Sequence, residues 1–281
     1  MPLPDNIKIP LTDDRSVLLE LVRIASGRFL MGSRNGYDDE EPVHEVCIPF
    51  DFYLGKFPVT QQEFGVWTQL ASIKHSNYFS SNDRHPAENM SWDESVQFCT
   101  WLGERYQHLQ SKEKAWPSGF QCALPSEAQW EYACNAWSET KNTNGSVKRV
   151  YSDYHIGDGE AALHQAGWYG DNNDSMTHAV GEKEANCHGL YDMHGNVHEW
   201  CVDFWHAHAY RHRVGSTIDP LVGSGDNSAD RVVRGGSWFV HASNCRAAFR
   251  FRRNPALRSR FQGFRVGLFP VRSSQSDKPA E

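Results

Sequence analysis

The chain has 281 residues, of which 39% are hydrophobic and 22% charged, so a packed core is expected and broad disorder is excluded. A formal net charge of −7 excludes a nucleic-acid-binding protein that relies on overall basicity. A mean hydropathy of −0.63, with no apolar run long enough to cross a bilayer, predicts no membrane-spanning segment.

Residues 1–14 carry Asp5, Asp13 and Asp14 and lack the apolar stretch of a secretory signal. We therefore expect a cytoplasmic protein. The seven cysteines include no CxxC pair, which favours buried, reduced thiols over a zinc site or a disulfide framework.

Strand patterns dominate the first part of the chain. Residues 16–24 are rich in Val, Leu and Ile, residues 27–32 end on a glycine, and residues 43–50 alternate between two faces. The acidic stretch between them is predicted to be a surface loop. Because we find no internal repeat and no interdomain linker, we predict a single domain over residues 16–272 and a flexible tail at 273–281.

Three helix starts carry the same signal. Thr60, Ser91 and Ser126 are each followed three positions later by Glu or Gln, the signature of a capping box. Apolar residues at helical spacing follow each box, so each helix is expected to bury one face. Helical periodicity disappears after residue 138, and short strands are expected at 231–234 and 263–266. With 12% aromatic residues, 22 Gly and 13 Pro, the chain is expected to be loop-rich.

A series of short motifs, taken in order, resembles the formylglycine-generating enzyme or sulfatase-modifying-factor family, which is related to the C-type lectin fold. The resemblance implies an α+β fold with little regular secondary structure. It also leaves function open, because the family contains both oxidases and non-catalytic binding proteins. The motifs occupy residues 27–33, 41–44, 58–61, 124–133, 189–193, 195–200, 234–238 and 263–266.

The resemblance allows a test for catalysis. The family's oxidases hold copper with two cysteine thiolates that follow the Arg-Gly-Gly-Ser motif. The second thiolate position matches Cys245, but the first falls on Val240, so a two-thiolate copper site cannot form there. Cys245 is then expected to be a small core residue, and Ser237, which matches an active-site serine, also fits a structural turn. We therefore predict no catalytic residue, with a metal-dependent oxidoreductase of this family as the alternative.

The resemblance also implies a Ca²⁺ site, because the family binds a hard cation through oxygen ligands in one tight loop. The alternative is that the two acidic members of this set bind backbone N–H groups or arginines. The matching positions are Asp192, Gly195 through its carbonyl, Val197 through its carbonyl, and Glu199.

Residues 238–262 resemble the variable region of proteins that are diversified by retroelements, in which changing positions are set into a fixed skeleton. The changing positions are rich in aromatic and arginine side chains, which dominate the energetics of interfaces. The alternative is that half of these rings belong to the core. The skeleton arginines, expected to satisfy carbonyl groups, are Arg246, Arg250, Arg258 and Arg265. The expected ligand-binding residues are Phe239, Val240, His241, Phe249, Phe251, Arg253, Leu257, Arg260 and Phe261.

The sequence therefore favours a non-catalytic, bacterial ligand-binding protein on a C-type lectin-like scaffold. Its expected partner is a protein or another macromolecule, and not a nucleic acid, which contacts the segment 238–262. A regulatory or scaffold module of a larger bacterial system is a further alternative. Retroelement diversification of the segment stays a hypothesis, and the sequence does not identify the ligand.

Overall fold

Strands from both ends of the chain pair with one another in the computed structural model, which describes residues 3–79, 83–112, 116–134, 138–141, 147–213, 215–225 and 229–271. A five-stranded antiparallel sheet has the order β1-β2-β5-β14-β6, so the last strand lies between two earlier ones. This pairing closes the domain. Its strands are β1 (Asn6–Pro10), β2 (Leu18–Ile24), β5 (Phe52–Gly55), β6 (Phe120–Ala123) and β14 (Gly267–Pro270).

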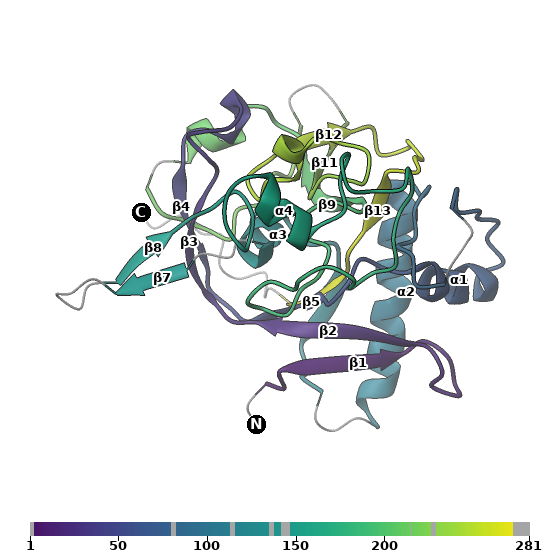
Figure 1. Cartoon of the computed structure of the whole chain (residues 1–281). Coiled ribbons are helices and arrows are strands. Elements are labelled where there is room, and N and C mark those ends of the chain that lie inside the picture. The colour runs from purple at the N-terminus through teal and green to yellow at the C-terminus, as the bar shows by residue number, and fades with distance from the viewer. Residues whose placement is uncertain are drawn as a thin grey trace.

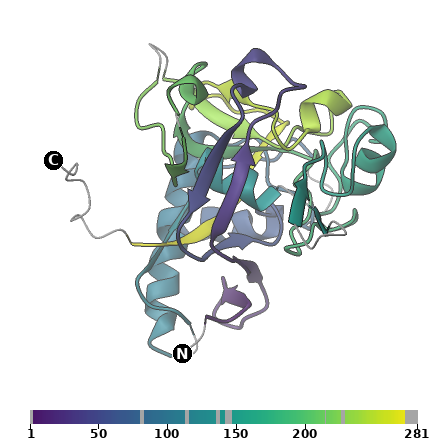
Figure 2. The same ribbon diagram turned by 90° about the vertical axis from the view of Figure 1, so that its left-hand side faces the viewer.

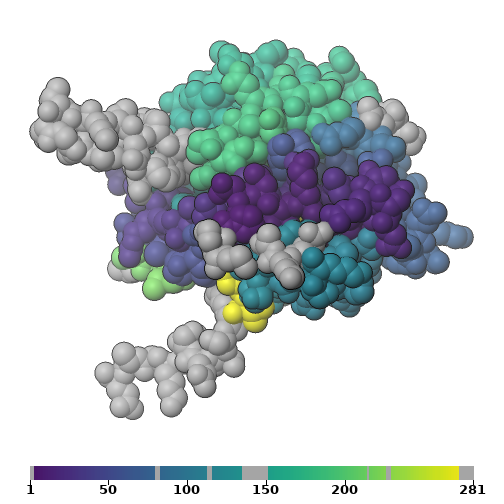
Figure 3. Space-filling model, turned by 90° about the horizontal axis from the view of Figure 1, so that it is seen from below, coloured from purple at the N-terminus to yellow at the C-terminus, as the bar shows by residue number. Residues whose placement is uncertain are grey.

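A four-stranded sheet has the order β12-β11-β9-β13, and its strands β12 and β13 lie within or at the end of residues 238–262, which we call the C-terminal segment. Figure 1 shows it at the upper end of the molecule, with β1 and β2 at the lower end. Seen from below in Figure 3, the purple N-terminal residues run across the opposite side. The C-terminal segment is therefore remote from the N-terminal strands. The strands of this sheet are β9 (His198–Phe204), β11 (Arg231–Arg234), β12 (Phe251–Arg253) and β13 (Gln262–Phe264).

Smaller elements complete the described part of the chain. A three-stranded sheet has the order β10-β4-β3, and Figure 2 turns its long β3–β4 pair toward the viewer. A separate hairpin joins β7 to β8. The strands are β3 (Gly27–Met31), β4 (His44–Ile48), β10 (Thr217–Ile218), β7 (Ser138–Lys141) and β8 (Val147–Val150). The short 3-10 helices are η1 (Asp38–Glu40), η2 (Ala209–His212) and η3 (Ala242–Cys245).

The three predicted capping boxes are confirmed. The hydroxyls of Thr60 and Ser91 accept the N–H of the glutamate three positions later, and each glutamate accepts the cap N–H in return. Ser126 and Gln129 make the same reciprocal pair, at 3.1 and 3.0 Å. These bonds satisfy N–H groups that a helix start would otherwise leave unpaired. The helices are α1 (Gln61–Leu70), α2 (Trp92–Gln110), α3 (Glu127–Cys134) and α4 (Glu160–Ala166).

Aromatic packing ties the C-terminal strands to the helices. The rings of Phe64 in α1, Phe98 in α2 and Phe264 in β13 lie 5.4–5.9 Å apart between centroids. All three side chains are buried, and burial of each such ring stabilises the fold by about 1.5–3 kcal/mol. The strand that ends the segment 238–262 is therefore fixed in the core.

Two sequence predictions need correction. The fold begins before residue 16, because β1 pairs with β2 along its whole length. Helix α4 lies in the region expected to lack helix. Its seven residues are too few to show a helical period, and it ends where Gly167 lies against the backbone of His194. The predicted tail at 273–281 lies outside the described residues.

Candidate functional site

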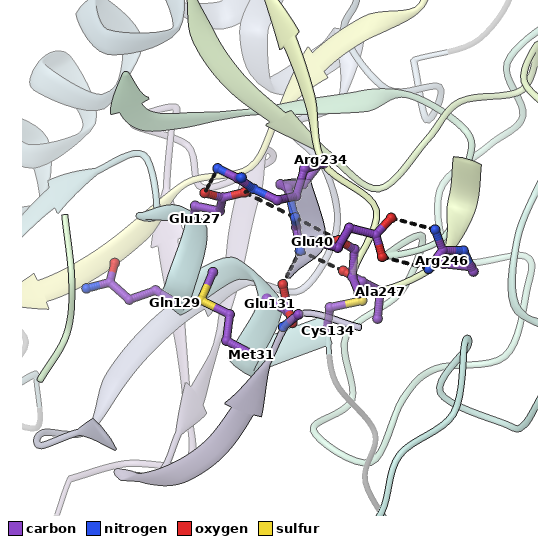
Figure 4. Close-up of polar contacts among 12 residues, drawn as sticks. Met31, Glu40, Glu127, Gln129, Glu131, Cys134, Arg234, Arg246 and Ala247 are labelled. Carbon is purple, nitrogen blue, oxygen red and sulfur yellow. Dashed lines mark hydrogen bonds and ion pairs between the residues drawn. The ribbon is translucent and has the colours of Figure 1, made fainter. Parts of the chain in front are cut away.

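Arginines from the C-terminal part of the chain are buried against glutamates from earlier parts (Figure 4). Glu127, at the start of α3, accepts bonds from Arg250 at 2.6 and 2.9 Å and from Arg234 at 3.1 Å. Burial alone would raise the pKa of Glu127, but Arg250 and Arg234 lower it to about 2. Glu40 accepts two bonds from Arg246, at 2.6 and 2.9 Å. Arg246 and Arg250 are therefore structural, as predicted, although they bind carboxylates as well as carbonyls.

A double-glycine turn lies just before the C-terminal segment. Gly235 and Gly236 have φ values of +88° and +75°, a region that favours glycine. A Cβ atom on Gly236 would also lie 2.5 Å from the sulfur of Cys245. Trp238 follows the turn, and its backbone N–H donates to the carbonyl of Asn196 at 2.9 Å. The turn therefore requires glycine and sets the position of the residues that follow.

The carboxylate of Glu199, one expected calcium ligand, is occupied by protein groups. Arg265 donates to it at 2.8 and 3.0 Å, and the indole N–H of Trp130 donates at 2.7 Å. All three side chains are buried. Glu199 therefore neutralises a buried guanidinium, which is the alternative role that the sequence left open.

The other three expected calcium ligands lie in a buried loop, where Asp192 also bonds to protein groups. Asp192 accepts the N–H of Gly181 at 2.8 Å and the side-chain amide of Asn196 at 3.1 Å. Burial raises the pKa of Asp192 to about 6. Gly195 and Val197 lie in the same buried loop. Within the described residues, no cluster of three or more His, Cys, Asp or Glu side chains could hold a metal. In this structure the carboxylates of Asp192 and Glu199 are therefore engaged by protein groups, which is the alternative to a Ca²⁺ site.

The cysteine that matches the oxidase position is a core residue. Cys245 is buried in a small cluster with Tyr154 and Leu163, and burial raises the pKa of its thiol to about 12. Val240 packs against the same cluster. The hydroxyl of Ser237 is buried without a described hydrogen-bond partner. All seven cysteines are free, but the predicted burial holds for only four of them, because Cys47 and Cys122 are half-buried and Cys187 is exposed.

Stacked rings lie on the surface beyond the double-glycine turn. Phe239 is 60% exposed, and its ring stacks on that of Phe261 at 4.9 Å between centroids. Both rings contact Trp238, which is buried beneath them. The guanidinium of Arg260 lies over Phe261 at 5.0 Å and over the exposed ring of Tyr78 at 4.9 Å. This cluster joins rings from two distant parts of the chain.

The remaining expected ligand-binding residues differ in exposure. Phe251, Leu257 and His241 are exposed, whereas Val240 and Arg253 are half-buried. The guanidinium of Arg253 lies 5.4 Å from the centroid of Phe251. We use the name C-terminal face for the set Phe239, Val240, His241, Phe251, Arg253, Leu257, Arg260 and Phe261.

Phe249 departs from the prediction, because it is only 6% exposed. Its ring packs between Tyr37 and Phe251 and so supports the face from below. Phe251 also stacks on the buried ring of His198, and the backbone N–H of His198 donates to the carbonyl of Phe261 at 2.8 Å. His198 thereby connects the two groups of rings. The skeleton residue Arg258 pairs with Glu94 of α2.

Tyr78 is a surface residue that the sequence analysis missed. It is 59% exposed, and its hydroxyl accepts a bond from Arg260 at 2.9 Å. It lies in a polar stretch with no strand or helix period, so only the tertiary fold brings it to the C-terminal face.

Comparisons with known proteins establish the family. Residues 9–268 match the model described as the sulfatase-modifying factor enzyme 1-like domain. The chain belongs to this family. Formylglycine-generating enzyme from Streptomyces coelicolor is 30% identical and covers 87% of each chain. The mouse enzyme is 31% identical over 64% of this chain and 43% of its own length.

Other proteins to which the chain is similar carry different names. The kinase pkn1 of Chlamydia caviae is 29% identical over 88% of this chain, but this chain spans only 37% of the length of that kinase. Among solved structures, Treponema denticola variable protein 1 superposes with a TM-score of 0.73 and 25% identity, covering 94% and 99% of the two chains. PvdO from Pseudomonas aeruginosa superposes with a TM-score of 0.70 and 22% identity, covering 95% of this chain and 99% of that structure, and shows the fold alone.

These comparisons confirm the resemblance to the formylglycine-generating enzyme family and to a variable protein, and with it the α+β C-type lectin-like fold. In the part of the chain that the structure describes, every helix is too short or too polar to cross a bilayer.

Proposed function

We propose that this member of the family binds a macromolecular ligand, in the first place another protein, through the C-terminal face and performs no catalysis. The stack of the exposed Phe239 on the half-buried Phe261, close to Arg260, carries the proposal. Rings and arginines are the side chains that dominate protein interfaces. A surface that gathers exposed rings without covering them is typical of an interaction site.

The likeness to Treponema denticola variable protein 1 supports a division between a fixed scaffold and a changing face. In this chain, Glu127, Arg234 and Arg250 form a buried network that anchors the backbone. The side chains of the C-terminal face, by contrast, lie at the surface or are half-buried. Because close-packed interiors do not tolerate free variation, only such a face could be diversified.

Diversification by a retroelement has a direct test in the DNA beside the gene. We expect a reverse transcriptase gene and a near-identical template repeat whose differences fall at adenines in the codons of residues 238–262. A flanking region without either would contradict diversification, while leaving the binding role open.

The alternative of a metal-dependent oxidoreductase rests on the identity to formylglycine-generating enzymes. Against it stand Val240 at the first thiolate position and the buried thiol of Cys245. Incubation with Cu(I) and a cysteine-containing peptide should leave the peptide thiol intact. An aldehyde product detected by mass would favour the oxidoreductase.

Binding can be tested with a phage-displayed random peptide library selected on the full-length protein. Peptides that bind should lose at least tenfold in affinity for the Phe239→Ala/Phe261→Ala variant, because the stacked rings are removed. The control Leu70→Ala/Ile218→Ala removes two side chains that are 65% and 71% exposed elsewhere on the surface. Equal loss in both variants, or no loss in the first, would contradict the proposal.

A further inference from the structure

The C-terminal segment concentrates positive charge on an acidic protein. Residues 238–262 contain six arginines and no Asp or Glu, whereas the whole chain has a net charge of −7. Two of the six, Arg246 and Arg250, are neutralised in the core. Arg258 pairs with Glu94, and Arg252 lies 3.8 Å from the carboxylate of Asp230.

Arg253 and Arg260 remain, and neither has a carboxylate partner among the described residues. Arg260 donates to the hydroxyl of Tyr78, and its guanidinium otherwise faces rings. The Nε–H of Arg253 is buried without a hydrogen-bond partner. A half-buried guanidinium has lost part of its hydration. A carboxylate that accepts its N–H groups restores the missing hydrogen bonds and supplies the opposite charge.

The rings hold both guanidinium groups in place. Arg260 lies 4.9–5.5 Å from the centroids of Tyr78, Phe261 and Trp238, and Arg253 lies over Phe251. A guanidinium group that lies over a ring can still donate its remaining N–H groups to a carboxylate. Arg253 and Arg260 are therefore two candidate carboxylate-binding positions beside exposed rings.

We propose that the ligand of this face is an acidic polypeptide segment. Its Asp or Glu side chains pair with Arg253 and Arg260, and its apolar side chains pack on Phe239 and neighbouring rings. This inference rests on the proposed binding function. A polypeptide fits better than a nucleic acid, because it can present single carboxylates to the two separate guanidinium groups and pack apolar side chains on the exposed rings.

The test is a random dodecamer library on phage, selected separately on the full-length wild type and on Arg253→Gln/Arg260→Gln. Asp and Glu should be enriched at least twofold over the unselected library on the wild type only. Synthetic versions of the wild-type-selected peptides should bind the double variant at least tenfold more weakly. Arg252→Gln, which changes a neighbouring arginine that already faces Asp230, should bind them within twofold of the wild type.

Two controls separate this inference from the proposed function. The double variant should melt within a few degrees of the wild type, so that loss of binding is not loss of folding. Neutral peptides that bind the wild type and Arg253→Gln/Arg260→Gln equally well, but do not bind Phe239→Ala/Phe261→Ala, would contradict an acidic ligand. They would still support binding through the C-terminal face.

Three further results would also overturn the inference. They are tighter binding of single-stranded oligo-dT than of any selected peptide, arginine-dependent dimerisation of the protein itself, and a wild-type selection that enriches no peptide. The first would assign the two arginines to phosphate, and the second to a second copy of this chain.

Discussion

Buried charged residues hold the C-terminal part of the chain through ion pairs in which each charge is neutralised by its partner. Glu199 and Arg265 are a clear case, because both side chains are fully buried and the pair is bidentate. Removing one partner of such a pair leaves the other charge buried and unpaired. Glu199 and Arg265, which lie in motifs of the family, therefore stabilise the fold of this chain.

We expect Glu199→Gln to lower the free energy of unfolding by about 3–5 kcal/mol, because it leaves the Arg265 guanidinium buried without a counter-charge. Urea denaturation measures this loss. Glu45→Gln is the control, since Glu45 pairs with Arg28 at the exposed surface and such pairs contribute about 0–1 kcal/mol. Similar losses in the two variants would show that the buried pair is not specifically stabilising.

Calcium provides a second test at this scale. Because protein groups occupy the carboxylates of Asp192 and Glu199, we expect the melting temperature to be unchanged by a chelator or by added Ca²⁺. A cation that bound only the folded state would raise the melting temperature by mass action. A rise with Ca²⁺ that disappears in Asp192→Asn would contradict this account.

At the scale of elements, a buried carboxylate positions the loop that carries Tyr78. Glu88 accepts the N–H of Phe79 at 2.9 Å, and the ring of Phe79 packs on Trp238 beneath the C-terminal face. The second oxygen of Glu88 has no described partner, and burial raises the pKa of this group to about 7. The loop that carries Tyr78 is thus held by the carboxyl group of Glu88, whose pKa lies near neutral pH.

This arrangement predicts a pH dependence of stability. Between about pH 4.5 and 7, folded Glu88 keeps a proton that the unfolded chain has lost, so the contribution of Glu88 to the free energy of unfolding falls as pH rises. Glu63, with its pKa also raised by burial to about 7, contributes with the same sign, whereas the buried His194 and His198, with pKa values lowered to about 3, contribute with the opposite sign. Glu88→Gln should remove the contribution of Glu88, so the change in the free energy of unfolding from pH 5 to pH 7.5, measured by urea denaturation, should be more positive than in the wild type. An unchanged slope would assign the dependence to other groups.

The sequence predicted helices better than it predicted strands. The capping boxes at Thr60, Ser91 and Ser126 are local signals, because the cap and its partner are three residues apart. Strand β1 carries no such signal and is defined by pairing with β2. Helix α4 is too short for its period to be visible. Sequence reasoning therefore missed elements that are defined by distant contacts, such as β1, and elements too short to show a period, such as α4.

At the scale of the whole molecule, the fold separates a stabilising scaffold from a surface free to change. The scaffold lies in the sheets and in the arginine–glutamate pairs, and Figure 1 places β12 and β13 at the end away from β1 and β2. The motifs were sufficient to predict this fold. They could not predict that Phe249 is buried, or that Tyr78 joins the face, because both follow from tertiary packing.

The central claim is that the C-terminal face serves binding and not folding, and one stability measurement tests it directly. We expect replacement of Phe239, His241, Phe251 and Leu257 together by serine to cost less than about 2 kcal/mol in urea denaturation, since surface substitutions usually stay within about 0.5 kcal/mol each. Phe264→Ala is the reference for a core ring and should cost about 3–5 kcal/mol. A loss in the fourfold variant that equals or exceeds the loss in Phe264→Ala would show that these residues belong to the core and would contradict the account.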